Sequence, residues 1–305
     1  MSRPRTRREM LGESVALVAA IAMPASLARV LGVARQADPD RERLAAWTTT
    51  LRTERLNGTK VPLGRAAVRV GEQAVGTPYE AYTLEAYLKA GGKPTSTEPL
   101  ALSLTRFDCV TLVESCLAIA RVARAEGAPP WERFGREVER MRYRHGARGD
   151  YTSRNHYFSE WISDGERRGL VRDLGAELGG DEDARPLRFM TEHRASYPAL
   201  ADDDVYRAIG EMERRLDAHA RRVIPTERIA SVADRIQTGD VLAFATSIPG
   251  LDVSHSAMAY RDRDGVLRVL HAPLSGGVVA VTKTTLPEYV ARIKRATGIL
   301  VARAV

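Results

Sequence analysis

The chain contains very little cysteine. Its 305 residues include only two cysteines, Cys109 and Cys116, and both lie in the segment RFDCVTLVESC. One pair of thiols cannot build the multi-bridge framework of a small disulfide-stapled protein. With 44% hydrophobic and 28% charged residues, the chain has the composition of a globular protein that forms its own core. The close placement of the two thiols therefore needs another explanation.

Several common functional motifs are also missing. The sequence has no HExxH, GxSxG, GxxxxGKS/T or GxGxxG pattern, which leaves out the usual signatures of zinc proteases, serine hydrolases, phosphate-binding loops and dinucleotide sites. The formal net charge is +7, and nearly all of the positive charge is arginine. These arginines alternate with Asp and Glu rather than clustering with aromatic residues. We therefore expect solvated helix faces and no nucleic-acid partner.

The first residues predict an export signal. MSRPRTRREML is rich in arginine, and the apolar stretch SVALVAAIAM that follows it is too short to span a bilayer. The pair Arg7-Arg8 resembles the twin-arginine export pattern. We expect residues 1–34 to be a signal peptide of that type, cleaved near residue 28 or 34, and the mature chain to be periplasmic without a membrane span. A buried N-terminal helix with basic flanks is the alternative.

The cysteine segment predicts a capped helix. VTLVESCLAIARVARAEG places apolar residues at helical spacing and ends at Gly127. Asp108 is a good N-cap, so Cys109 takes the first helical position. Seven residues of helix rise about 10.5 Å, and a disulfide needs Cα atoms within about 7 Å, so these thiols cannot pair on one helix. Cys116 continues the apolar face, whereas a helix N-terminus lowers a thiol's pKa and makes Cys109 a candidate nucleophile. An inert cysteine at a helix start is the alternative.

From about residue 238 the pattern changes to the period of two that is typical of strands. We predict consecutive antiparallel strands, a meander, at VLAFAT, LDVSHSAMAY, VLRVLHAPL, VVAVT and GILVARA. His255 shares a strand face with Val253, Ala257 and Ala259, and His271 ends the next strand. Adjacent strands can bring the two imidazoles together, so that one activates a thiol and the other orients the first. Alternatively, each is a core histidine bonded to a carbonyl.

These segments resemble a known superfamily. FDCVTLVE, GDVLAF, VSHSAMAY and VLHAP look like the NlpC-type cell-wall peptidases, which are papain-like. There a cysteine opens a helix, a histidine lies on a following strand, and a third polar residue lies on the strand after. The resemblance implies that Cys109 is the nucleophile, His255 the base and His271 its orienting partner, and that Tyr79, in VGTPYEAY, lies near the oxyanion site. The Ala272-Pro273 pair departs from the pattern, because a small polar residue often follows His-Ala.

Within this superfamily the chain is most similar to the N-acetylmuramoyl-L-alanine amidase-like family. The resemblance covers roughly residues 65–300 and is carried by GTPY followed by TLE, FDCVTLVE, SRNHYFSEW and PGLDVSH.

The segment YRHGARGDYTSRNHYFSEWI combines groups that suit a muropeptide substrate. Arginines pair with carboxylates and aromatic rings stack on sugars. We expect substrate contacts from Asp108, Arg154, Asn155, His156, Tyr157 and Trp161. A polar surface loop leading into a helix is the alternative.

The sequence thus predicts an α+β, papain-like enzyme, with a helical part over residues 35–225 and a β-rich part over residues 226–305 in a single catalytic domain. We expect a monomeric, cofactor-free hydrolase of peptidoglycan amide bonds, with no metal. Three alternatives stay open: a γ-D-glutamyl stem-peptide endopeptidase of the same fold, a non-catalytic wall-binding module, and a zinc site formed by Cys109, His255 and His271.

Overall fold

The computed structural model describes residues 38–218, 220–274 and 277–305, and residues 38–305 form one compact unit. The predicted signal peptide lies outside the described residues. The helices of eight residues or more are α2 (Pro39–Thr53), α3 (Leu63–Ala74), α5 (Cys109–Ala123), α6 (Trp131–Arg142), α7 (Phe158–Arg167) and α9 (Asp203–Leu216). The shorter ones are α4 (Ala86–Lys89), α8 (Phe189–Glu192), α10 (Ile229–Val232) and α11 (Leu286–Arg292). Within the described ranges, no helix is both long enough and apolar enough to cross a membrane.

An eight-stranded antiparallel sheet forms the centre of this unit. Its strands are β1 (Val171–Asp173), β2 (Asp181–Asp183), β3 (Arg221–Pro225), β4 (Val241–Thr246), β5 (Val253–Arg261), β6 (Leu267–His271), β7 (Ala280–Val281) and β8 (Ala296–Ala304). The order is β2-β3-β8-β4-β5-β6-β7, and β1 pairs with one end of β8. The fold is therefore α+β, as predicted.

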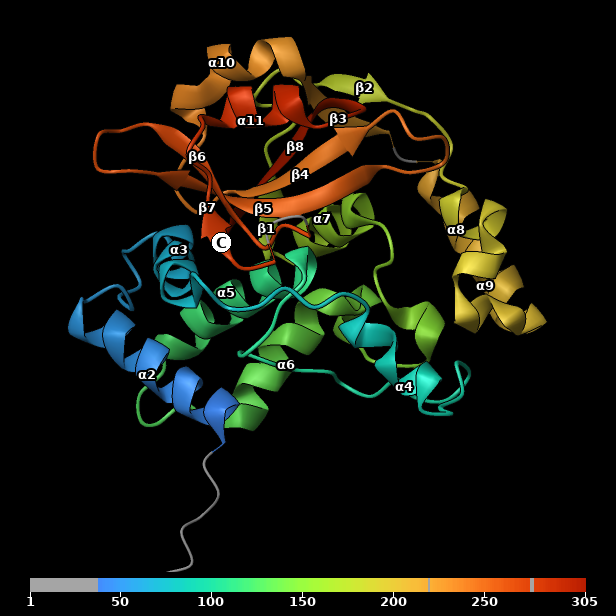
Figure 1. The fold of residues 1–305 in the computed structure, drawn as a ribbon, viewed down its shortest axis with the longest axis horizontal. Helices are drawn as coiled ribbons and strands as arrows, with labels where there is room; N and C mark the ends of the chain where they lie inside the picture. Colours follow the sequence, from blue (N-terminus) through green and yellow to red (C-terminus); the bar gives the residue numbers. More distant parts are fainter. Residues whose placement is uncertain (1–37, 219, 275–276) are drawn as a thin grey trace, which may run out of the picture. The chain divides into compact units, whose positions relative to one another are not determined.

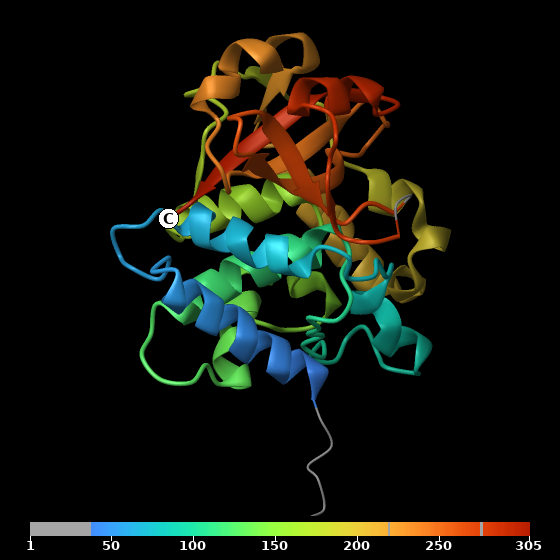
Figure 2. The same cartoon turned by 60° about the vertical axis from the view of Figure 1, so that its left-hand side comes forward.

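The sheet lies between two layers of helices (Figure 1). Helices α3, α5 and α7 cover one face, with α2 and α6 behind them, and α10 and α11 cover the other (Figures 1 and 2). Because both faces are covered, all six residues of β4 are buried. Alternate residues of β4 contribute to two separate apolar clusters: Ala243 packs on the α5 side, and Leu242 and Phe244 on the α11 side.

The predicted meander is correct for β4 to β7 and wrong for β8. β8 pairs with β4, on the side opposite to β5. Helix α11 lies between β7 and β8 in the chain and packs over the sheet, so the chain returns to the far edge of β4. The predicted boundary at residue 226 is also too late, because β1, β2 and β3 all precede it.

One predicted strand face needs a correction as well. Ala257 and Ala259 pack on the α11 side, but Val253 packs on the α5 side. The pairing of β4 with β5 shifts register between Phe244 and Ala245, and such a bulge reverses the face on which the preceding residues lie.

Candidate active site

Helix α5 begins at Cys109, as predicted, and its start is fixed by a capping box. The Asp108 carboxylate accepts hydrogen bonds from the Thr111 N–H (2.7 Å) and hydroxyl (2.9 Å), and the Asp108 N–H donates to Thr111 Oγ1 (2.9 Å). These reciprocal bonds hold the first turn rigid. The structure therefore gives Asp108 a capping role, and its contact with substrate stays a prediction.

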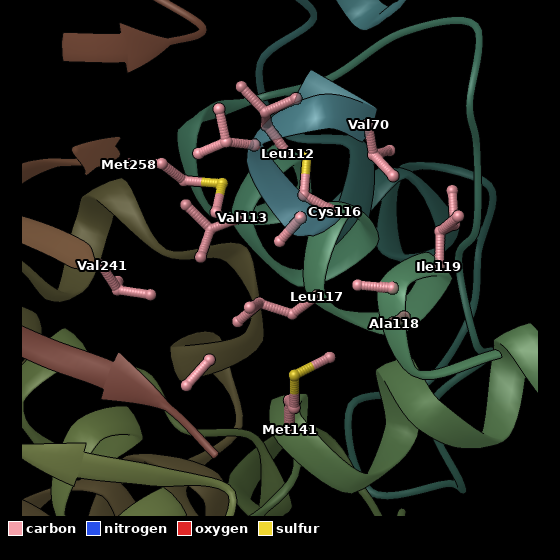
Figure 3. Packing of buried hydrophobic residues seen from close by; sticks show 14 of the residues in the cluster. Val70, Leu112, Val113, Cys116, Leu117, Ala118, Ile119, Met141, Val241 and Met258 are labelled. Carbon is pink, nitrogen blue, oxygen red and sulfur yellow. The ribbon is translucent and has the colours of Figure 1, made fainter. Parts of the chain in front are cut away.

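Cys116 lies two turns further along α5 in the apolar core. It is 1% exposed and packs among side chains that include Val70, Leu112 and Met258 (Figure 3). Both cysteines are free. The expectations that Cys116 is a small buried hydrophobe and that the two thiols do not pair are confirmed.

His255 and His271 lie side by side on β5 and β6. His255 Nε2 and His271 Nδ1 are 2.9 Å apart, and the Tyr289 hydroxyl of α11 is 3.2 Å from the same His271 nitrogen. The His255 ring also stacks on Phe244, with ring centroids 5.6 Å apart. His255 is thus held in one orientation by a ring face and a hydrogen bond.

One pocket brings Cys109 and His255 together with part of the polar segment. It is lined by Cys109, Asn155, His156, Trp161, His255 and Ser256, among others. The Asp252 carboxylate accepts a hydrogen bond from the Ser159 N–H (2.8 Å), which ties the start of α7 to the start of β5. This contact sets the position of Trp161, one turn along α7, relative to the two strands.

Tyr79 lies near Cys109 but belongs to a different part of the chain. Its N–H donates to the Gly277 carbonyl (2.8 Å), and the flanking residues pair with Phe107, so its main chain is held on both sides. Burial and the charges of Cys109 and Asp108 raise the pKa of Tyr79 to about 12. The pKa of Tyr289 is raised to about 12 by burial and by Cys109. Two protonated phenols therefore lie near the thiol.

Two predicted substrate contacts lie elsewhere. The Arg154 side chain is 5% exposed, lies 2.9 Å from Glu85 and 3.6 Å from Glu98, and does not line this pocket. The Tyr157 hydroxyl donates to Glu213 (2.7 Å) inside a separate cluster around α9. Both side chains are buried and are used in internal packing.

Asn155 and His156 do line the pocket, each fixed by a main-chain carbonyl. Asn155 Nδ2 donates to the Met141 carbonyl (3.2 Å), and His156 Nε2 lies 2.8 Å from the Tyr151 carbonyl. Burial, with the nearby Arg154 charge, lowers the pKa of His156 well below its usual value. Both side chains are therefore rigid and uncharged parts of the wall.

The electrostatics of Cys109 differ from the prediction. Burial, followed by the charge of Asp108, raises the thiol pKa to about 11, so these effects outweigh the helix N-terminus. Burial and the neighbouring His271 lower the pKa of His255 to about 3, and burial lowers that of His271 to about 4. At neutral pH the site therefore contains a neutral thiol and neutral imidazoles.

Tyr289, Asp252 and Ser256 also lie at this site and were not predicted from the sequence. No local pattern in LPEYVAR marks Tyr289, because Tyr289 lies on helix α11 and its partner His271 lies on strand β6. Ser256 directly follows His255 in VSHSAMAY, and Asp252 precedes β5, so proximity to the predicted histidine was a usable signal for both. Within the described residues, no three His, Cys, Asp or Glu side chains are grouped as a metal site requires.

Comparison with known proteins assigns this chain to a family. The family model AmiA-like, described as N-acetylmuramoyl-L-alanine amidase-like, matches residues 69–299. The chain therefore belongs to the N-acetylmuramoyl-L-alanine amidase-like family. A comparison with curated proteins found no match.

Solved structures share the fold of this chain. An N-acetylmuramoyl-L-alanine amidase from Bacteroides uniformis is 28% identical, covers 80% of this chain and 99% of its own, and superposes with a TM-score of 0.72. A Bacteroides fragilis protein that carries a provisional xylanase name is 34% identical, covers 76% and 98%, and has a TM-score of 0.69. A Legionella pneumophila protein of the family DUF1460, 18% identical over 87% and 94% of the two chains with a TM-score of 0.61, shares the fold.

Proposed function

We propose that this protein is an exported, papain-like cysteine amidase of the NlpC type that cleaves the amide bond between N-acetylmuramic acid and L-alanine in peptidoglycan fragments. The observation that carries the proposal is the shared pocket of Cys109 and His255, with His255 Nε2 placed 2.9 Å from His271 Nδ1. Family membership supports the substrate class. The proposal of export is based on the signal-peptide pattern of residues 1–34, and it includes a twin-arginine route to the periplasm.

The hydrogen bond between the imidazoles supports a division of roles. For His255 to accept a proton at Nδ1, its Nε2 must carry hydrogen and donate it to His271 Nδ1. The 2.9 Å distance suits this bond, and His271 then selects the tautomer and orientation of the base. Since both thiol and imidazole are neutral at rest, His255 removes the proton as the sulfur attacks, rather than from a pre-formed ion pair.

The proposed reaction assigns one step to each of these groups. The Cys109 sulfur attacks the lactyl carbonyl, its proton moves to His255, and the amide carbonyl becomes an oxyanion. The amine of L-alanine leaves with the proton from His255, which gives a thioester, and water then releases the acid and regenerates the thiol. The first N–H groups of α5 have no acceptor within the helix, so the Cys109 N–H is available to the oxyanion, together with the Tyr79 hydroxyl.

The test is hydrolysis of defined muropeptides, with products identified by mass. We expect the mature protein to release the intact stem peptide beginning with L-alanine. Cys109→Ala and His255→Ala should abolish hydrolysis, while His271→Asn should keep part of it because asparagine can still accept a hydrogen bond from the imidazole.

Cys116→Val is the matched thiol control, because Cys116 contacts only the core. It should retain activity and lose at most a couple of kcal/mol of stability. Cleavage after γ-D-glutamate instead would favour the endopeptidase. Binding to peptidoglycan without cleavage would leave only a wall-binding module, and activity that a chelator removes would favour the zinc site.

A further inference from the structure

We propose that Ser256 stabilises the Cys109 thiolate by donating both its main-chain N–H and its side-chain hydroxyl to the sulfur. This role deepens the proposed function and rests on it, since it matters only if Cys109 is the nucleophile. Ser256 would then be a further catalytic residue, beside the cysteine and the two histidines.

The position of Ser256 follows from the alternation of β5. His255 stacks on Phe244 on the face of the sheet toward α11. Ser256, the next residue, is paired with Ala243, which belongs to the cluster on the α5 side. Successive strand residues point to opposite faces, so the Ser256 side chain lies on the α5 side of the sheet. Cys109, His255 and Ser256 line the same pocket.

The Ser256 hydroxyl is buried and lacks a partner. Ser256 is 1% exposed, and its Oγ has no hydrogen-bond partner within the described part of the chain. An unpaired buried hydroxyl destabilises a protein unless something offsets its cost. In the resting site the neighbouring thiol is neutral and is a weak acceptor. A thiolate is a strong acceptor, so formation of the negative charge gives this hydroxyl its partner.

The electrostatics of the thiol agree with this placement. Burial and the charge of Asp108 raise the pKa of Cys109, whereas the Ser256 N–H, the Ser256 hydroxyl and the Cys109 N–H lower it. These donors are the groups that oppose the penalty of burying the negative charge. When His255 takes the proton from the sulfur, the electron pair that remains on Sγ is therefore held by Ser256 until the carbonyl carbon accepts it.

The experiment measures the reactivity of the Cys109 thiol, without any substrate. The rates of alkylation by iodoacetamide are compared at the same pH values, from pH 7 to 10, in the Cys116→Val background, so that only Cys109 reports. In this range, below the thiol pKa, the ratio of the rates of two variants gives the difference between their thiol pKa values. A hydrogen bond to a charged group changes its pKa by roughly one unit or more. We expect Ser256→Ala to raise the apparent pKa by about one unit and to slow alkylation roughly tenfold at pH 7, whereas its midpoint of thermal unfolding should not fall.

Ser254→Ala is the matched control on the same strand. The Ser254 hydroxyl lies 3.5 Å from the Phe244 carbonyl, so its removal should leave the thiol pKa unchanged. An unchanged thiol pKa in Ser256→Ala, with Cys109→Ala still inactive on muropeptides, would refute the role of Ser256 alone. A shifted thiol pKa in a protein that cuts no muropeptide would support that role and refute the proposed function instead. Equal shifts of the thiol pKa in Ser256→Ala and Ser254→Ala would also refute the role of Ser256.

Discussion

Acidification should destabilise this protein through His255 and His271, the paired imidazoles of the candidate site. Burial lowers the pKa of His255 to about 3 and that of His271 to about 4, whereas an imidazole in the unfolded chain takes up a proton near pH 6.5. Below about pH 6.5 the unfolded state therefore binds more protons than the folded state. Stability is lost as the pH falls from about 6.5 toward 4, and the loss ends once the folded imidazoles are protonated.

The magnitude follows from the same values. Each imidazole changes the free energy of unfolding by about 1.4 kcal/mol per pH unit within this window. Between pH 7 and pH 5 that amounts to about 2 kcal/mol for one histidine and about 4 kcal/mol for both. Since domains are stable by only about 5–15 kcal/mol, the effect is large enough to measure.

The assay is urea unfolding at pH 7 and pH 5 for the wild type and for His271→Asn. We expect the variant to lose about 2 kcal/mol less than the wild type over this interval, because one buried imidazole is gone. Buried carboxyl groups with raised pKa, such as Glu114 and Asp252, act with the opposite sign, but both proteins contain them and the difference cancels them. The exposed His193, changed to Asn, is the control and should show the wild-type pH dependence. Equal losses in the wild type and His271→Asn would refute this reasoning.

Two further predictions concern stability. Arg142 and Glu114 form a buried ion pair at 2.8 Å, with side chains 4% and 1% exposed. Arg142→Met should therefore lower the free energy of unfolding in chemical denaturation by about 3–5 kcal/mol, and the double variant Arg142→Met/Glu114→Leu should regain most of that loss. An unchanged free energy of unfolding in Arg142→Met would contradict this. Gly239 has a φ of 87°, and a Cβ there would lie 2.1 Å from the Gly64 carbonyl oxygen. Gly265 has a similar φ of 79°, but a Cβ there would meet nothing within 4 Å. Gly239→Ala should therefore lower the midpoint of thermal unfolding well beyond Gly265→Ala. Similar midpoints for the two glycine variants would show that the close approach is unimportant.

Local sequence determined the parts of the site that depend on neighbours in the chain. Asp108 and Thr111 cap α5 through contacts three residues apart, which places Cys109 at its first position. The spacing of two turns places Cys116 on the buried face. His255 and His271 come together because β5 and β6 are joined by a short turn, and antiparallel pairing of adjacent strands is a local outcome.

Only the tertiary structure decided which buried partner each polar group has and where the last strand pairs. Arg154 faces Glu85 and Glu98 rather than the pocket, and Tyr157 bonds to Glu213, because those partners come from distant segments that no local pattern relates. β8 pairs with β4 because α11 carries the chain across the sheet. The prediction of a lowered pKa for the Cys109 thiol was wrong for the same reason. The helix N-terminus is a local effect, whereas burial of Cys109 depends on the surrounding fold, and burial changes the pKa more.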